Sequence, residues 1–182
     1  MTRTVLWVLA GAVLGGIIHL LVILSLPALA NQSLWSGIAT LGATNRVVVL
    51  PVPGPGEANP LGLDPELTYA ACQIDLRKGP GFVRGTLPVA FWSVAVYGPA
   101  GTTLYSTTNR DGIGATLDLG IFNAAQTRLL AQQQLDIAQG LLIVEAREDD
   151  VMAVVRLAPA HQAVRARYEA ALAKLSCGNL PS

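Results

Sequence analysis

The feature that most constrains this chain is an uninterrupted apolar stretch near its start. Residues 5–26 form a run of 22 amino acids without a formal charge, in which only His19 and Ser25 are distinctly polar. As an α-helix, this run is about 33 Å long, against a hydrocarbon core of about 30 Å in a typical bilayer. Its length therefore predicts a membrane-spanning helix.

A signal peptide that is removed after export is the alternative. Ala28, Leu29 and Ala30 form an A-x-A cleavage pattern, and Pro27 is expected to break the helix just before it. The apolar part of a signal peptide is usually shorter, at roughly 7–15 residues. We weigh the length of the run above the cleavage pattern and interpret residues 1–30 as a retained transmembrane anchor.

Positive charge sets the expected orientation of the anchor. Arg3 and the amino terminus carry the only positive charges before Arg46, and the cytoplasmic flank of a membrane helix is normally the more basic one. We therefore expect the N-terminus in the cytoplasm and the rest of the chain outside. In a bacterium, this describes a single-pass inner-membrane protein whose C-terminal domain is periplasmic.

Small and polar residues line one face of the expected anchor. Trp7, Gly11, Gly15 and His19 recur every four residues and so lie on the same side of a helix. GxxxG spacing lets two helices approach closely in lipid, and an intramembrane histidine needs a hydrogen-bond partner. We interpret Gly11, Gly15 and His19 as a helix-association face. Alternatively, the glycines only reflect the composition of membrane helices, and the His19 ring reaches the headgroups or a water molecule.

The rest of the chain predicts a short linker and a β-rich domain. Residues 31–44 have helical apolar spacing, which predicts a short amphipathic helix at the outer membrane interface or a linker helix packed on the domain. In residues 45–182, we expect six to eight mostly antiparallel strands and two helices, the last one C-terminal. The predicted fold class is α+β: a single transmembrane helix followed by a sandwich-like domain.

Alternating side chains give the clearest strand predictions. Residues 67–76 alternate between two faces, one of which carries Cys72, and residues 89–97 form the strongest expected strand, with Trp92, Val94 and Val96 on one face. A four-residue "GPAG" turn then predicts a hairpin with the strand that follows. Residues 141–146 and 151–157 are expected to pair around the acidic turn "REDD".

Two helices are expected within the domain. Asn123 is placed to cap the first, which would run to about Gln134 and bury Leu129 and Leu130. Pro159 would lie in the first turn of the second, which would end near Ser176.

The two cysteines predict a disulfide. Cys72 lies within an expected strand, and Cys177 is expected to end the last helix. An even pair far apart in sequence favours a disulfide in an oxidising compartment, where it would hold that helix against the sheet. Two buried free thiols are the alternative.

Few residues suggest chemistry. The net charge is zero, and no basic stripe is present, so nucleic acid is not an expected partner. The GxSxG and HExxH motifs are absent, and His161 is the one histidine outside the anchor. We expect no catalytic residue, cofactor or metal ion, and we favour a non-enzymatic role.

One polar cluster follows the expected central hairpin. Tyr105, Asn109, Arg110 and Asp111 could line a shallow cleft together with Trp92 or Tyr97. This is our candidate surface for a ligand or partner. Alternatively, its side chains satisfy the backbone of a long loop, as Asn and Asp commonly do.

The central region resembles a known family. The matching residues are Cys72, Asp75, Leu76, Gly79, Pro80, Phe91, Trp92, Ser93, Val96, Tyr97, Tyr105, Ser106, Asn109 and Arg110. These resemble the family called domain of unknown function 1254, and the front of the chain, with Gly15, Gly16 and His19, resembles its small membrane-anchored alphaproteobacterial branch. The resemblance implies a retained anchor and a companion of the 1214 family in a membrane complex. It implies no catalytic residue.

Two alternative functions follow from these features, and the first is favoured. The first is a non-enzymatic subunit of a membrane complex, which associates through the Gly11, Gly15 and His19 face with a partner protein or a second copy. The second is a periplasmic ligand-binding protein or enzyme that uses the loop from Tyr105 to Asp111.

Overall fold

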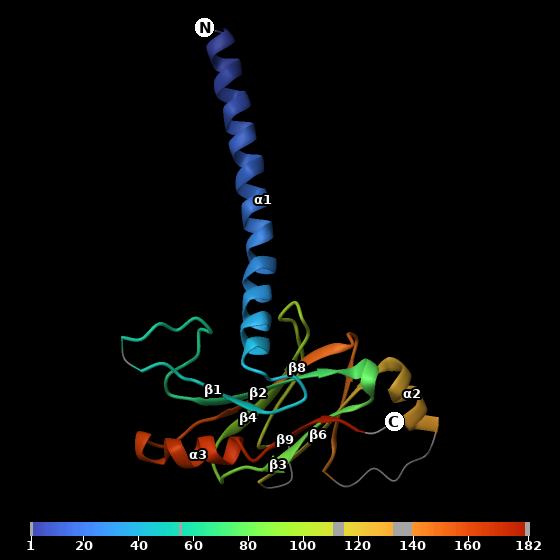
Figure 1. Cartoon of the computed structure of the whole chain (residues 1–182). Helices are drawn as coiled ribbons and strands as arrows, with labels where there is room; N and C mark the ends of the chain where they lie inside the picture. Colours follow the sequence, from blue (N-terminus) through green and yellow to red (C-terminus); the bar gives the residue numbers. More distant parts are fainter. Residues whose placement is uncertain (1, 55, 111–114, 133–139, 181–182) are drawn as a thin grey trace.

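The protein consists of one long helix standing on a β-rich domain (Figure 1). The computed structural model describes residues 2–54, 56–110, 115–132 and 140–180. Its nine strands form two sheets and are accompanied by two shorter α-helices and two 3-10 turns. The predicted α+β class, with an N-terminal apolar helix and a mainly antiparallel domain, is confirmed.

The first helix, α1 (Thr2–Thr40), is longer than expected. It has 39 residues and is helical throughout, so the expected break at Pro27 is absent, and the anchor and the expected 31–44 helix are one element. One proline removes a single backbone hydrogen bond and costs about 3 kcal/mol, which can bend a long helix without ending it. Gly42, two residues after the end of α1, has a φ of 75°. This left-handed conformation is typical of the residue that terminates a helix.

Two sheets stack to form the domain. The five-stranded sheet is antiparallel throughout, in the order β1 (Val48–Leu50), β2 (Thr68–Asp75), β8 (Asp150–Leu157), β4 (Trp92–Tyr97), β5 (Thr103–Thr108). The four-stranded sheet has the order β7 (Leu142–Ala146), β6 (Thr116–Asn123), β3 (Gly81–Thr86), β9 (Ser176–Asn179), and its β6–β7 pair is parallel. Side chains from both sheets form the main core, with Trp92, Leu119 and Ile121 almost fully buried in it.

The expected hairpin between residues 141–146 and 151–157 is wrong. The two segments are β7 and β8, and they belong to different sheets: β7 pairs with β6, whereas β8 lies between β2 and β4. Five consecutive residues of β8, from Val151 to Val155, are buried, as expected for a central strand that is covered on both faces. The acidic turn therefore carries the chain from one sheet to the other.

The two shorter helices differ in part from expectation. In α2 (Ala124–Gln132), the Oδ1 atom of Asn123 accepts a hydrogen bond from the Gln126 amide at 3.0 Å, which confirms the predicted cap. However, Leu129 is 56% exposed, so the prediction that it is buried is wrong. The closing helix, α3 (Arg165–Leu172), is shorter than expected, and β9 follows it.

Cys72 and Cys177 are at disulfide distance, with their Cα atoms 6.6 Å apart. Cys177 lies in strand β9 and not at the end of a helix as expected. The bond therefore joins β2 of one sheet to β9 of the other across the core. Because it closes a loop of 105 residues, the chain-entropy model gives it a stabilising contribution of about 4–5 kcal/mol.

Candidate functional site

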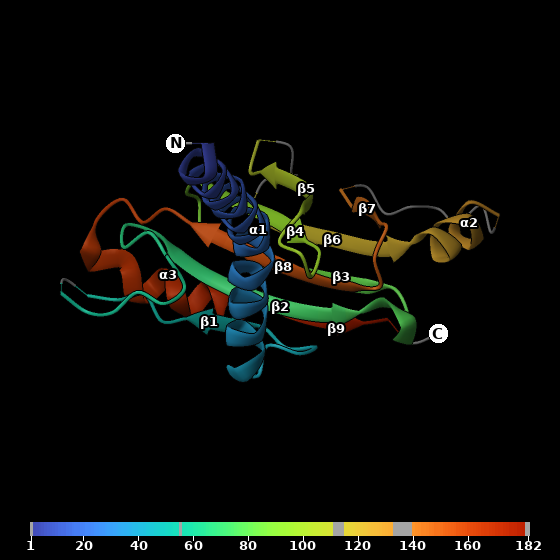
Figure 2. The ribbon, with the colours of Figure 1, turned by 90° about the horizontal axis from the view of Figure 1, so that it is seen from above.

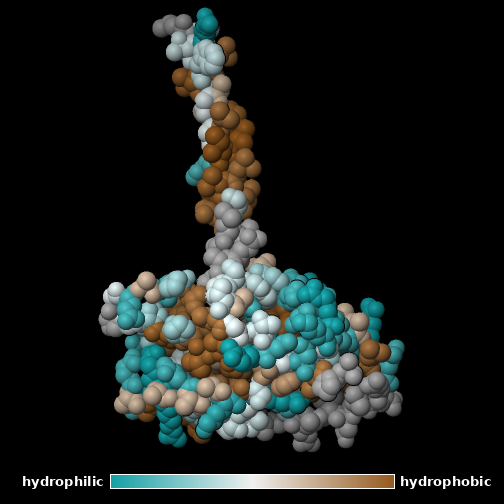
Figure 3. Space-filling view, in the orientation of Figure 1, coloured by the Kyte–Doolittle hydropathy of each residue, from teal (hydrophilic) through white to brown (hydrophobic). Residues whose placement is uncertain are grey.

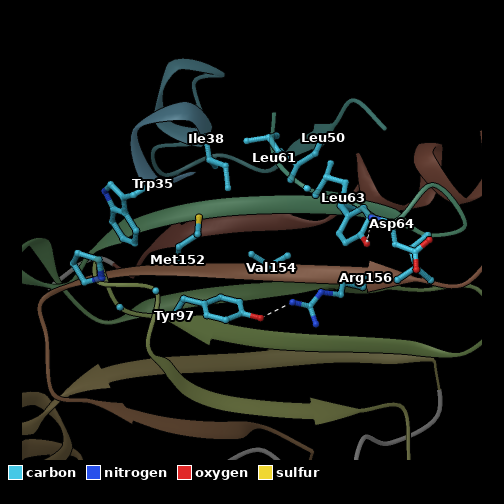
Figure 4. A pocket seen from close by; sticks show the side chains of 16 residues that line it. Trp35, Ile38, Leu50, Leu61, Leu63, Asp64, Tyr97, Met152, Val154 and Arg156 are labelled. Atoms are coloured by element: carbon cyan, nitrogen blue, oxygen red, sulfur yellow. Dashed lines mark hydrogen bonds between the residues drawn. The ribbon is translucent and has the colours of Figure 1, made fainter. Parts of the chain in front are cut away.

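An open apolar groove lies on the outer face of the five-stranded sheet, at the foot of α1 (Figure 4). Its volume is about 490 Å³. In Figure 3, brown atoms gather on the same side of the domain, next to the foot of the helix. The lining residues come from α1, the segment before β2, the β4–β5 turn and four strands: Trp35, Ile38, Leu50, Leu61, Gly62, Leu63, Asp64, Leu67, Tyr69, Tyr97, Gly98, Pro99, Gly101, Met152, Val154 and Arg156.

The floor of the groove consists of outward-facing strand residues. Because side chains alternate along a strand, the residues between the core positions of β2, β8 and β4 point away from the main core. Tyr69 of β2 lies opposite Arg156 of β8, and Tyr97 of β4 lies opposite Met152 of β8. These three strands thus present a second apolar surface beneath the end of α1.

The last turns of α1 form one wall of the groove. Ile38 is only 6% exposed, and the Gln73 side chain donates a hydrogen bond to the Trp35 carbonyl at 3.0 Å. Just beyond the helix, the main-chain N–H of Gln73 donates a hydrogen bond to the Ala43 carbonyl at 2.8 Å. Seen from above, the lower end of α1 lies over the sheet that contains β2 and β8 (Figure 2). The helix is therefore tied to the sheet where it leaves the domain.

The segment before β2 forms the opposite wall. The Asn59 side chain both donates to the Leu63 carbonyl at 2.7 Å and accepts from the Leu63 amide at 2.9 Å. The Asp64 amide donates to the Tyr69 hydroxyl at 3.0 Å, and Arg165 donates to the Leu67 carbonyl at 3.2 Å. These bonds hold a segment without regular structure in one place above the floor.

Arg156 is the one cation among the lining residues. It is half-buried, its guanidinium group donates a hydrogen bond to the Tyr97 hydroxyl, and its Cζ atom lies 6.0 Å from the centre of that ring. Among the described residues, the ion pairs involve Arg77, Lys78 and Arg84, and none includes Arg156. The groove is thus an apolar trough that carries one cationic side chain, Arg156, and one carboxylate, Asp64, which form no ion pair with each other.

The structure separates the candidate surface predicted from the sequence. Trp92 is 1% exposed and belongs to the core between the sheets, whereas Tyr97 faces the groove on the other side of the same sheet. Tyr105 packs against the main core. Of the described residues of the predicted cluster, Tyr97 alone lines the groove. Trp92 does not, because it lies five positions earlier in β4 and so faces the other side of the sheet.

The polar residues of this cluster make local backbone contacts. The Asn109 amide donates to the Trp92 carbonyl at 3.1 Å, and its side chain donates to the Ala90 carbonyl at 3.3 Å. The Arg110 amide donates to Thr108 Oγ1 at 3.3 Å, and its side chain is exposed. These contacts agree with the alternative that the cluster organises a loop. Asp111 lies outside the described residues.

Sequence reasoning missed Arg156 and the groove itself. The available signal was the segment Val151–Leu157: it is apolar on both faces, so both faces must be covered, and Arg156 interrupts the outward one. The residues that cover this face come from α1 and from the segment before β2. Neither sequence pattern indicates which part of the domain the segment packs against. Within the described ranges, no cluster of three or more His, Cys, Asp or Glu side chains could hold a metal ion.

Comparisons with known proteins establish no family for this chain. No family model matches it, and no curated protein does, so the resemblance to domain of unknown function 1254 stays a prediction. Two solved structures align with part of it: a protein from Vibrio parahaemolyticus (9% identity, TM-score 0.48, 63% of this chain) and an uncharacterised protein from Burkholderia cenocepacia (14%, 0.48, 71%). The chain spans 28% and 36% of their lengths.

Proposed function

We propose that this chain is a single-pass protein of the bacterial inner membrane, with its domain in the periplasm, and that it is a non-enzymatic subunit of a membrane complex. Association would occur through the face of α1 formed by Gly11, Gly15 and His19. The observation that carries the proposal is the unpartnered apolar part of α1, which the domain does not use for its own folding.

Within the segment Thr2–Leu26, a window of 18 residues has a mean hydropathy of 2.4, and none of the segment is buried by the rest of the chain. An apolar helix of 25 residues in water would expose far more apolar surface than a soluble monomer normally tolerates. A bilayer removes this surface from water, and the length of the segment matches the thickness of the hydrocarbon. These points support a retained anchor, as does the continuation of the same helix to the docked turn at Ile38.

The glycines of α1 support association with another helix. A Cβ atom at Gly11, Gly15 or Gly16 would meet nothing within 4 Å, so contacts within the chain do not require glycine at these positions. Glycine in a helix costs about 0.5–1 kcal/mol relative to alanine. Close approach of a second helix would offset this cost and would explain the spacing.

Two observations support the periplasmic side. The cysteine pair at disulfide distance suggests an oxidising compartment. Arg3, at the start of α1, is the charge that the positive-inside tendency would keep in the cytoplasm.

A membrane two-hybrid assay with the full chain tests the association. We expect Gly15→Leu to lower the signal strongly, because a leucine there would hold the backbones apart. Ala10→Leu is the matched control, since it adds bulk on the other side of the helix, and it should leave the signal unchanged. An equal signal from wild type and Gly15→Leu would remove this interface. If Gly15→Leu lowers the signal, purification in mild detergent shows whether the partner is a second copy or a different protein, such as the 1214-family companion that the resemblance implies.

Fractionation tests the retained anchor separately. We expect the intact chain to resist extraction from membranes with alkaline carbonate and to keep its first residues in mass spectrometry. A mature chain that begins at Asn31 and is released into the soluble periplasmic fraction would contradict the anchor.

A further inference from the structure

We infer that the groove at the foot of α1 binds one acyl chain of an anionic lipid from the bilayer that the anchor enters, with the acidic headgroup held at Arg156 and Tyr97. The inference rests on the proposed anchor. It assigns the domain a ligand class and a site that the helix-association role does not include.

The shape and lining of the groove fit a hydrocarbon chain. Its volume of about 490 Å³ falls within the usual range for ligand pockets, roughly 300–1,000 Å³. The floor around Met152 and Val154 is apolar, and the walls carry Trp35, Ile38 and Leu61. The floor residues Met152 and Val154 are largely covered by the walls, at 8% and 7% exposed, and an acyl chain would fill the remaining apolar space without needing hydrogen bonds.

The polar groups of the groove fit an acidic headgroup. Among the described residues, no carboxylate lies within ion-pair distance of Arg156, and its bonded partner, the Tyr97 hydroxyl, can donate its own proton to an anion. Asp64 also lines the groove, but one of its oxygens accepts the Glu66 amide at 2.9 Å. Figure 4 shows the Arg156 guanidinium extended towards Tyr97 rather than towards Asp64. A phosphate oxygen can therefore approach the free side of the guanidinium group.

The position of the groove selects a membrane lipid over a soluble acid. Its wall and the proposed anchor are the same helix, α1. Trp35 lies nine residues beyond Leu26, the end of the apolar segment, which is about 14 Å along the helix axis. The headgroup layer is roughly 5–8 Å thick on each side of the hydrocarbon. The wall at Trp35 thus lies roughly 6–9 Å beyond the headgroup layer, so the lipids of the outer leaflet are the apolar ligands nearest to the groove.

The test uses the full, disulfide-bonded chain in mixed vesicles of phosphatidylglycerol and phosphatidylcholine. In one sample, the phosphatidylglycerol carries a photoactivatable diazirine in the middle of an acyl chain; in the other, the phosphatidylcholine carries it. After illumination, mass spectrometry locates the labelled residues. We expect phosphatidylglycerol to label groove residues such as Met152, and phosphatidylcholine to label them several-fold less.

Three variants sharpen the test. Arg156→Gln removes the charge and should lower groove labelling by about tenfold or more, as expected for a charge-assisted bond. Val154→Trp fills the floor and should abolish it. Arg84→Gln is the matched control, because Arg84 lies in the other sheet and pairs with Asp118 at 2.7 Å; it should leave labelling unchanged. Non-reducing electrophoresis and circular dichroism check that each variant is folded, and Arg156→Gln decides the outcome if Val154→Trp does not fold.

The outcomes separate this inference from the proposed function. Labels confined to Thr2–Leu26 would overturn the lipid site and leave the anchor standing. Equal groove labelling from both lipids would overturn the acidic headgroup. Labels nowhere in the chain would show that it does not enter the bilayer, and both proposals would then fall. Groove labelling that appears only after a co-purified protein is removed would identify the groove as a protein interface and refute the lipid.

Discussion

Removal of the disulfide is expected to destabilise the domain strongly. The bond between Cys72 and Cys177 closes a loop of 105 residues, for which the chain-entropy model gives about 4.7 kcal/mol at 25 °C. The Cα–Cα distance of 6.6 Å lies within the range that disulfides accept without movement of the backbone, so most of this term should be realised. We expect the Cys72→Ala, Cys177→Ala double variant to lose about 4 kcal/mol of unfolding free energy.

Urea unfolding of the full chain in detergent measures this loss, with fluorescence of the buried Trp92 as the probe. For a domain of this size, a slope of about 1–3 kcal/mol per molar urea is typical, so the midpoint should fall by roughly 1.3–4 M. Wild type kept in reducing agent is the matched control and should unfold with the double variant. A loss below about 1 kcal/mol would refute the reasoning, because the bond would then add little constraint to the unfolded chain.

The same variant tests which element the bond holds. Strand β9 is an edge strand with β3 as its one neighbour in the sheet, so its amides should exchange with solvent much faster once the bond is absent. Amides in β8, which has a partner on each side, should lose protection only with global unfolding. Equal acceleration in β8 and β9 would show that the bond acts on the whole domain and not mainly on the edge.

Two further predictions concern Ile38 at the foot of α1 and Asp75 at the C-terminal end of β2. Ile38→Ala should lower the unfolding free energy by about 2–4 kcal/mol, because Ile38 is 6% exposed and packs on the outer face of the five-stranded sheet. Leu129→Ala, at a position that is 56% exposed, should change it by less than about 0.5 kcal/mol. Equal losses in urea unfolding would contradict this packing. The side-chain hydrogen bond from Arg77 lowers the pKa of Asp75, so this carboxylate stabilises the fold above its unfolded pKa of about 3.9 and ceases to do so as the pH falls through its lower folded value. Wild type should therefore be more stable than Asp75→Asn at pH 6, and this difference should shrink as the pH falls below about 3.9; a difference that stays constant during acidification would refute the role of the charge.

Much of the local structure followed from the sequence. Alternation separated the two faces of β2 and of β4, and the "GPAG" turn predicted the β4–β5 hairpin, which is present. Alternation did not identify the buried face, so Trp92, which lies in the main core, was wrongly included in the candidate surface. The cap at Asn123 was also predictable, since the residue and its bonded partner are three positions apart. In each case, the deciding interactions lie within a few residues along the chain.

The failed predictions concern partners that are distant in sequence. β7 and β8 are adjacent in the chain, and their short acidic turn suited a hairpin, yet each strand found partners in a different sheet. Pairing depends on which arrangement buries both faces of β8, and that depends on the whole domain. For the same reason, β9 was mistaken for the end of a helix, because its four residues gain their conformation from β3 and the disulfide.

Periodicity and composition are properties of contiguous residues, so the apolar length of α1, the strand faces, the turns and the available cysteine pair can be read from the chain directly. The two-sheet arrangement and the groove with Arg156 arise only when the domain folds. The groove exists because α1 docks on one side of the outer face of β2 and β8, and the segment before β2 docks on the other. Such docking depends on the complementarity of surfaces that are far apart along the chain, which no local pattern records.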